Sequence, residues 1–211
     1  MMAGTRARAT PGGAADTSFC LISSTEWSVN MSKKIVVLTG SPRRNGNSTA
    51  MASAFIKAAG EKGHRVKRFD VAEMSIGGCR ACEDCFKTGK ACSIDDDFNG
   101  MAPDIEEADV VVFAMPVYWY SIPAQIKAVI DRLNCFVLGG RNVASKECAL
   151  IGCCEEKDMT VLDGIRIPYE RTIAFLKWIS VGEVLIPGVS KAGDIEKTDG
   201  RARAAALADR I

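Results

Sequence analysis

The 211-residue sequence contains one histidine and lacks several of the patterns that identify common protein classes. That residue, His64, lies in a predicted strand away from the predicted ligand-binding loops, which argues against a histidine-based catalytic triad. No apolar run approaches the roughly 20 residues that a membrane-spanning helix needs, so we expect no membrane partner. The net charge of +1 gives neither the basic excess that favours nucleic acid nor the acidic field typical of dedicated electron carriers.

The composition is otherwise that of an ordinary globular domain, apart from its cysteines. Hydrophobic residues make up 47% and charged residues 25% of the chain, as in a protein that folds around one core. Nine cysteines is a high number, but no secretory signature precedes them. We therefore predict a cytoplasmic protein whose cysteines are thiols or metal ligands rather than a disulfide framework.

Residues 1–30 differ from everything that follows. The segment is rich in Ala, Gly, Thr and Ser, shows no hydrophobic period, and its apolar patch at 19–22 is shorter than the core of a signal peptide. We interpret it as a disordered or non-native N-terminal extension. Met31 directly precedes a strand-like run, so we expect a single domain over residues 31–211.

From Met31 onward, β-branched runs alternate with segments of helical period. This alternation predicts a doubly wound α/β fold with a five-stranded parallel sheet between two helical layers. The expected strands are Ile35–Thr39, His64–Val71, Asp109–Met115, Glu147–Gly152 and Ser180–Pro187. The expected helices are Ser48–Lys62, Phe98–Ala108, Pro123–Phe136, Met159–Trp178 (interrupted at Pro168) and Ile195–Ile211.

The segment IVVLTGSPRRNGNST at residues 35–49 has the form of a strand, a tight loop and a helix N-terminus. Such a junction favours an anion, because the first amides of a helix point outward and carry about half a positive charge. The loop adds short polar side chains and two fixed positive charges: Ser41, Asn45, Asn47, Ser48 and Thr49, with Arg43 and Arg44. The segment predicts a phosphate-binding loop.

A second loop, PVYWYSIP, follows the most apolar predicted strand. In open α/β sheets the ligand lies beyond the carboxyl ends of the strands, where this loop and the first one meet. Its aromatic residues Tyr118, Trp119 and Tyr120 suit a ligand with a flat ring, although buried aromatics also cap cores. The dinucleotide and Walker fingerprints are absent, since Gly46 is followed by Asn47 instead of Lys. With the dinucleotide-binding and Walker patterns excluded, the remaining candidate ligand is a mononucleotide such as FMN.

Several motifs, taken in order, resemble one family. GSPRRNGNST, the cysteine segment followed by DDDF, PVYWYSIPAQIKAVIDR and GVSKAGDI are similar to the NADPH-dependent FMN reductase-like branch of the flavodoxin superfamily, and more narrowly to its iron-sulfur-flavoprotein-like members. The resemblance covers about residues 33–211. It implies a flavodoxin-like sheet of order 2-1-3-4-5 and non-covalently bound FMN.

Carried over by position, the resemblance also implies which residues hold the cofactor. One group would bind the phosphate and the other would line the isoalloxazine ring. The phosphate group is Ser41, Arg43, Asn47, Ser48 and Thr49, and the ring group is Pro116, Val117, Tyr118, Trp119 and Tyr120. No side chain is assigned as a catalytic acid or base, because the flavin carries the chemistry.

Four cysteines, Cys79, Cys82, Cys85 and Cys92, follow the spacing C-x2-C-x2-C-x6-C. Three thiols at three-residue spacing are typical of cubane iron-sulfur ligands, whereas zinc sites more often use two separated pairs. The resemblance supports a 4Fe-4S cluster on these four residues. Free thiols in a loop and a zinc site remain the alternatives.

The function implied is an FMN-dependent oxidoreductase that passes electrons from NAD(P)H to a quinone, a flavin or another small acceptor. The alternative is an iron-sulfur flavoprotein or flavodoxin-like carrier reduced by a protein partner such as ferredoxin. The resemblance also implies a homodimer or homotetramer with flavin sites near subunit boundaries.

Three smaller expectations concern charges and thiols outside the loops. The acidic run Asp95–Asp97 suits the N-cap of the following helix. Arg132 is expected on the surface of its helix, and Cys135 is interpreted as a structural residue. Cys153 and Cys154 end the fourth strand, close to the predicted ligand.

Overall fold

The computed structural model describes residues 32–211, so the expectations for residues 1–30 and for Met31 lie outside the described residues. Its centre is a five-stranded parallel sheet of order β2-β1-β3-β4-β5. The strands are β1 (Lys34–Thr39), β2 (Arg65–Asp70), β3 (Val110–Pro116), β4 (Glu147–Cys153) and β5 (Ile179–Ile186). The predicted flavodoxin-like order is confirmed, with the very apolar β3 at the centre and the more polar β2 at an edge.

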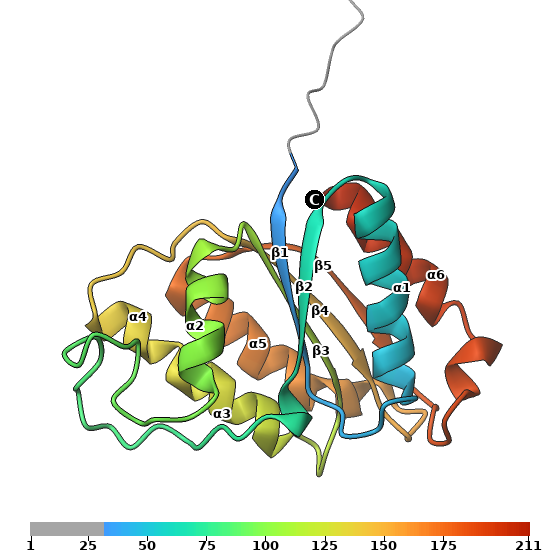
Figure 1. The fold of residues 1–211 in the computed structure, drawn as a ribbon. Helices are drawn as coiled ribbons and strands as arrows, with labels where there is room; N and C mark the ends of the chain where they lie inside the picture. Colours follow the sequence, from blue (N-terminus) through green and yellow to red (C-terminus); the bar gives the residue numbers. More distant parts are fainter. Residues whose placement is uncertain (1–31) are drawn as a thin grey trace, which may run out of the picture. The chain divides into compact units, whose positions relative to one another are not determined.

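Helices cover both faces of the sheet (Figure 1). The helices α1 (Asn47–Glu61) and α6 (Gly200–Ala206) pack together on one face. The other face carries α2 (Phe98–Glu107), α3 (Ala124–Arg132), α4 (Asn134–Leu138) and α5 (Asp163–Leu176). Short 3-10 turns are η1 (Val71–Glu73), η2 (Met159–Leu162), η3 (Asp194–Lys197) and η4 (Leu207–Arg210). The three-layer α/β/α architecture is therefore confirmed.

The alternation of side chains along β1 explains why its sequence reads as an unbroken apolar run. Ile35 and Val37 contribute to the core beneath α1, whereas Val36 and Leu38 contribute to the core beneath α2. All four are at most 3% exposed. A parallel strand covered on both faces has no solvent side on which a polar residue is favoured.

Three predicted helices are divided differently in the structure. The predicted helix at 123–136 bends at Leu133, where α3 ends and α4 follows. The segment 159–178 begins as η2, and α5 then runs through Pro168, its sixth residue, so the predicted interruption at Pro168 was wrong. The segment 195–211 is split into η3, α6 and η4.

Arg132 lies in the core, so the prediction that it is a surface charge was wrong. Its side chain is 1% exposed and pairs with Asp96, which is 10% exposed. Two hydrogen bonds of 3.0 and 3.1 Å join the guanidinium to the carboxylate, and a third of 3.0 Å reaches the carbonyl of Gly77. Asp97 occupies the N-cap position of α2 as predicted, but its side chain accepts from the Ser75 N–H and not from a helix amide. The first amide of α2, that of Phe98, donates to the Asp96 carboxylate at 3.2 Å.

The pKa of Asp96 reflects this environment. Burial by itself raises the pKa of the carboxyl, but hydrogen bonds from Arg132 and from the Gly77 N–H outweigh burial and hold the pKa below its ordinary value of 3.8. The ion pair thus fastens the loop that precedes α2 to the C-terminal end of α3.

None of the helices between residues 32 and 211 has both the length and the apolar content that crossing a bilayer requires.

Candidate functional site

A cavity of about 480 Å³ opens at the carboxyl edge of the sheet. This volume falls within the roughly 300–1,000 Å³ of typical small-molecule sites. Its walls are the segments that follow β1, β3, β4 and β5, so the predicted loops do meet at one place. The lining residues include Ser41, Arg43, Gly46, Asn47, Ser48, Pro116, Val117, Tyr118, Trp119, Tyr120, Cys153, Cys154, Glu155, Glu156, Val189, Ser190 and Ala192.

The N-terminus of α1 forms one end of this cavity. Its N-cap is Gly46, which offers no side-chain acceptor to the first-turn amides, and these have no partner within the helix either. A Cβ built at Gly46 would come to 3.0 Å from both the Arg43 carbonyl oxygen and the Ser41 hydroxyl. The absence of a side chain at Gly46 therefore keeps the cradle open, and an anion placed there would receive the helix amides.

Two predicted phosphate residues also tether the segment after β5. The Arg43 guanidinium donates to the Ser190 carbonyl at 3.1 Å. The Asn47 side chain donates to the Lys191 carbonyl at 3.0 Å and accepts from the Ile195 N–H at 3.2 Å. The side-chain amide of Asn47 is thus hydrogen-bonded to the protein through both its nitrogen and its oxygen. The exposed Arg43 makes one such bond, so its other N–H groups are available to a ligand.

Thr49, Arg44 and Asn45 line a neighbouring cavity of about 410 Å³ instead of the main one. The Thr49 hydroxyl donates to the Arg43 carbonyl at 3.2 Å, which stabilises the loop from behind. Arg44 is exposed and pairs with Glu73 at 2.7 Å. Of the predicted phosphate group, Ser41, Arg43, Asn47 and Ser48 are the members that reach the main cavity.

The aromatic loop ends in a two-residue turn. Tyr118 and Ser121 exchange both backbone hydrogen bonds at 3.0 Å, so Trp119 and Tyr120 are the central residues. Their φ angles are 46° and 58°, a left-handed conformation that such turns normally give to Asn and Gly. Holding a bulky residue there costs about 1–3 kcal/mol. Strain of this kind persists only where the surrounding structure enforces it.

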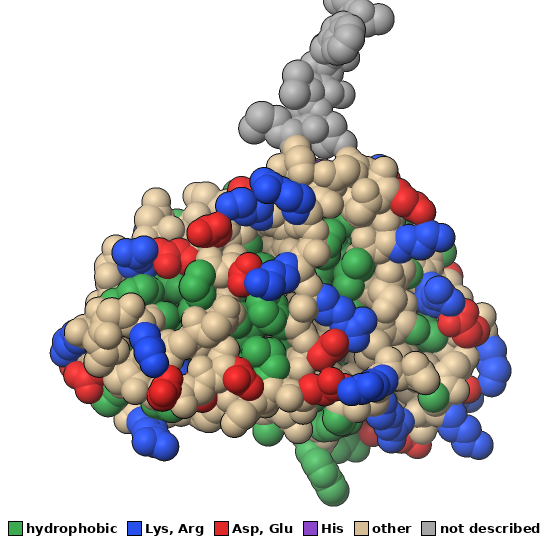
Figure 2. All heavy atoms as spheres, in the orientation of Figure 1, with side chains coloured by type: hydrophobic (Ala, Val, Ile, Leu, Met, Phe, Trp, Pro, Cys, Tyr) green, Lys and Arg blue, Asp and Glu red, His purple; other side chains and the backbone are tan. Residues whose placement is uncertain are grey.

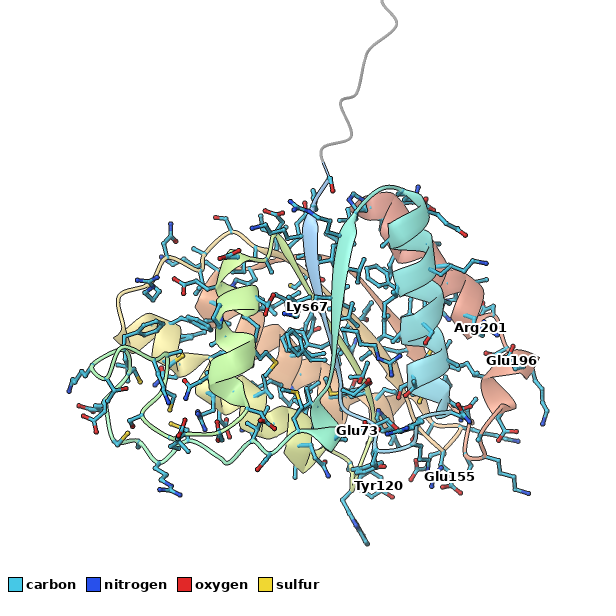
Figure 3. All side chains as sticks on the ribbon, in the orientation of Figure 1. Lys67, Glu73, Tyr120, Glu155, Glu196 and Arg201 are labelled. Atoms are coloured by element: carbon cyan, nitrogen blue, oxygen red, sulfur yellow. The ribbon has the colours of Figure 1, made fainter. Side chains whose placement is uncertain are left out.

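The same turn presents aromatic surface to solvent at the mouth of the cavity. Trp119 is 95% and Tyr120 62% exposed, and hydrophobic side chains project from the lower edge of the molecule in Figure 2. Tyr120 and Glu155 lie at the same end of the sheet, although they follow different strands (Figure 3). Large exposed aromatics beside a cavity are suited to contact a flat ring.

Two buried thiols line the main cavity between the N-terminus of α1 and the aromatic turn. Cys153 and Cys154 are each 3% exposed. Burial raises the pKa of Cys153 to about 12, although hydrogen bonds from Ser48 act in the opposite direction. Burial also raises the pKa of Cys154 above its ordinary value of 9.0, so both thiols stay neutral near pH 7 and form a weakly polar surface of poor nucleophiles.

The segment 189–192, which follows β5, also lines the main cavity, although the sequence predicted no role for it. It belongs to the family-like motif GVSKAGDI, which contains neither aromatic residues nor a glycine-rich anion-binding pattern. Its position follows from the parallel sheet, because β5 ends beside β4 at the same edge. That topological argument was the signal available in the sequence.

A third, much smaller cavity of about 20 Å³ lies between the cysteine segment and α3–α4. The four predicted cluster cysteines and Cys135 all line it, together with Arg132. Cys79 and Cys82 are exposed, whereas Cys92 and Cys135 are buried. The Nε–H of the buried Arg132 has no hydrogen-bond partner in the described part of the chain. Within residues 32–211, no three or more His, Cys, Asp or Glu side chains are arranged to hold a metal ion.

Comparison with known proteins identifies the family of the chain. The family model described as NADPH-dependent FMN reductase matches residues 33–161. An iron-sulfur flavoprotein of Archaeoglobus fulgidus is 35% identical over 100 residues, which are 47% of this chain and 45% of that protein. The chain spans about half the length of the curated relatives that it matches.

Solved structures show the same fold. An azoreductase of Bacillus anthracis superimposes with a TM-score of 0.66 at 20% identity, covering 86% of this chain and all of that one. An NAD(P)H:quinone oxidoreductase of Methanothermobacter marburgensis gives 0.64 at 16% identity, covering 84% and 96%. The matched family model covers more than half of the sequence and includes the three cavity walls that follow β1, β3 and β4. The chain therefore belongs to the NADPH-dependent FMN reductase family.

Proposed function

We propose that the protein is an FMN-dependent oxidoreductase that takes electrons from NAD(P)H and passes them to a quinone, a flavin or another small acceptor in the cytoplasm. The observation that carries this proposal is the two-ended cavity, with an uncapped helix N-terminus at one end and an aromatic turn at the other. A mononucleotide has a phosphate at one end, which suits the helix N-terminus, and a flat ring at the other, which suits the aromatic turn. The family model and the iron-sulfur flavoprotein relatives support a flavin.

In this proposal each wall has a separate task. Ser41, Ser48 and the amides of the first turn of α1 bind the phosphate, with Arg43 adding charge. Asn47 and Thr49 act indirectly, because their side chains hold the loop and the segment after β5 in place. Bound FMN would supply the hydride and electron chemistry.

The ring would lie along Pro116, Val117, Tyr118, Trp119 and Tyr120. Val117 is fixed there because its N–H donates to the Cys153 carbonyl at 2.8 Å, which extends the sheet beyond β3. The neutral Cys153 gives the ring a weakly polar neighbour.

The proposal is tested by anaerobic purification followed by an absorption spectrum and addition of NADPH. We expect a flavin spectrum with about one FMN per chain, bleached rapidly by NADPH. Reduction by ferredoxin alone would favour the carrier instead. A protein that stays colourless after reconstitution with FMN would overturn both assignments.

Two adjacent arginines provide a matched pair for the phosphate end. Arg43→Ala should weaken FMN binding roughly three- to tenfold, since it removes one exposed charge from the phosphate. Arg44→Ala should change the affinity less than about twofold, because Arg44 is paired with Glu73. Fluorescence titration of FMN gives both dissociation constants, and equal effects of the two substitutions would contradict the assignment.

A specific observation also favours the iron-sulfur alternative: five cysteines line one cavity, beside the buried Arg132, whose Nε–H has no hydrogen-bond partner among residues 32–211. The donor set fits a thiolate-bound cluster, which carries negative charge and would supply one-electron transfer. The cavity as it stands is too small for a cluster, so the exposed Cys79 and Cys82 would have to move outward.

The ligand set can be tested with two cysteines from the same cavity. Cys85→Ser should abolish cluster loading, whereas Cys135→Ser should retain it, because Cys135 lies on α4, outside the C-x2-C-x2-C-x6-C segment. The measurement is iron and acid-labile sulfide per chain after anaerobic reconstitution. Wild-type protein without iron, or equal iron in both variants, would count against a cluster on Cys79, Cys82, Cys85 and Cys92.

We further propose a homodimer or homotetramer, in which a second copy covers the exposed Trp119. Large exposed aromatics are uncommon on monomers unless they serve binding. Sedimentation equilibrium would give the mass, and a monomer at micromolar concentration would contradict this.

A further inference from the structure

The strained turn at Trp119 and Tyr120 rests against the start of α5. A Cβ built at Gly164 would overlap the carbonyl oxygen of Tyr120 and lie 3.1 Å from the Ser121 nitrogen. Real Cβ atoms do not approach a backbone so closely, so only glycine permits this contact. Gly164 is the second residue of α5, in a stretch where alanine would otherwise be the better helix former.

A second glycine brings α5 into that position. A Cβ built at Gly152 of β4 would overlap the Ile165 side chain. Ile165 is fully buried, and it occupies the space that a side chain at 152 would take. The side chain of Ile165 thus seats the start of α5 on the sheet, and the adjacent Gly164 meets the turn. The contact of Gly152 with Ile165 and the contact of Gly164 with the Tyr120 carbonyl thus connect β4, through α5, to the aromatic turn.

We infer that Gly164 is a positioning residue for the ring end of the site: its contact with the Tyr120 carbonyl holds the Trp119–Tyr120 turn in its left-handed conformation. Neither central residue favours that conformation by itself. The turn has one pair of backbone hydrogen bonds of its own, between Tyr118 and Ser121. The contact with α5 is a second constraint on it, and it explains how strain persists in so exposed a segment. This inference rests on the proposed FMN site.

The test is Gly164→Ala, with Gly100→Ala in α2 as its control. A Cβ at Gly100 meets nothing within 4 Å, so the control makes the same change in a helix without a clash. We expect Gly164→Ala to weaken FMN binding at least tenfold and to speed hydrogen exchange of the 118–121 amides at least tenfold. Gly100→Ala should leave both unchanged, and neither variant should lower the melting temperature by more than a few degrees.

A second pair of variants approaches the turn from its own side, in case Gly164→Ala folds poorly. Tyr120→Pro forces φ to about −65° and so excludes the observed 58°. Tyr120→Ala removes the same ring but permits the conformation. The inference predicts that Tyr120→Pro binds FMN at least fivefold more weakly than Tyr120→Ala.

The outcomes separate this inference from the proposed function. Wild-type protein that fails to bind FMN would overturn the function, while hydrogen exchange would still report on the contact. Wild-type protein that binds FMN, with Gly164→Ala matching it in affinity and in exchange of the 118–121 amides, would overturn the role of Gly164.

Discussion

Replacing Ser48 with aspartate is expected to weaken FMN binding by roughly 100- to 1,000-fold. Ser48 is 2% exposed and lies in the first turn of α1, at the wall of the main cavity. A carboxylate there would occupy the position proposed for the phosphate and repel it. Two like charges about 4 Å apart at an effective dielectric constant of 20 interact by about 4 kcal/mol, and each 1.4 kcal/mol is about tenfold in affinity.

The same substitution should not damage the helix. Ser48 is 2% exposed, so a carboxylate there bears a cost of burial. Its position in the first turn at the wall of the cavity offsets that cost, because the helix amides interact favourably with a negative side chain, and the melting temperature of FMN-free Ser48→Asp should stay within a few degrees of wild type. Ser48→Asn has nearly the same shape without the charge, and it should lose less than about tenfold in affinity. Equal losses in the two variants would show that size, not charge, is responsible, and would argue against a phosphate at this position.

The largest effect on folding is expected from Arg132→Met. This change leaves the Asp96 carboxylate, only 10% exposed, without its two guanidinium hydrogen bonds. Breaking a buried ion pair from one side costs about 3–5 kcal/mol. It also removes the cation from the Phe98 ring, 4.7 Å from the guanidinium carbon. Urea unfolding would measure the difference in unfolding free energy.

Arg141→Met is the matched control. Its guanidinium also lies over a phenylalanine, at 5.0 Å from the centre of the Phe86 ring, and pairs with Glu106. Since its side chain is 48% exposed, the expected cost is below about 1 kcal/mol. A cost for Arg132→Met no greater than for Arg141→Met would contradict the structural role given to the buried pair.

The pH dependence of the Arg132→Met effect has a definite sign. The folded-state pKa of Asp96 is lower than its ordinary value of 3.8, so its stabilising contribution is fully present above about pH 4 and is lost as the pH falls through the folded pKa. The stability difference between wild type and Arg132→Met should therefore shrink below about pH 4. A difference that stays constant down to pH 2 would show that the carboxylate is not the group involved.

The fold and the walls of the site were predictable from sequence because they follow from local signals. The β-branched runs of β1 and β3 mark buried parallel strands, and the Gly40–Asn47 loop marks a helix start with little side-chain bulk. Parallel strands end at a common edge, so the two loops had to meet. Long-range contacts had no such signal. The burial of Arg132 depends on Asp96, which is 36 residues away, and a helix pattern alone does not distinguish a buried arginine from an exposed one.

The contact between Gly164 and the Tyr120 carbonyl is another long-range feature without a local signal. A glycine in the first turn of a helix is common and does not by itself indicate a close contact. A Trp-Tyr pair does not predict a left-handed turn, because Asn and Gly are the residues that favour that conformation. Similarly, the spacing of four cysteines does not reveal that Cys135 shares their cavity. These features depend on how β4, α4 and α5 pack, and only the three-dimensional structure shows them.

The central claim, that the amides leading into α1 bind a phosphate group, is tested most directly by comparing FMN with riboflavin. The two ligands share the ring and differ only in the phosphate, so titrating each into the apo-protein measures the contribution of that end of the cavity alone. We expect FMN to bind at least about 100-fold more tightly, as charge-assisted hydrogen bonds to several donors would produce. Equal dissociation constants for FMN and riboflavin would contradict the account.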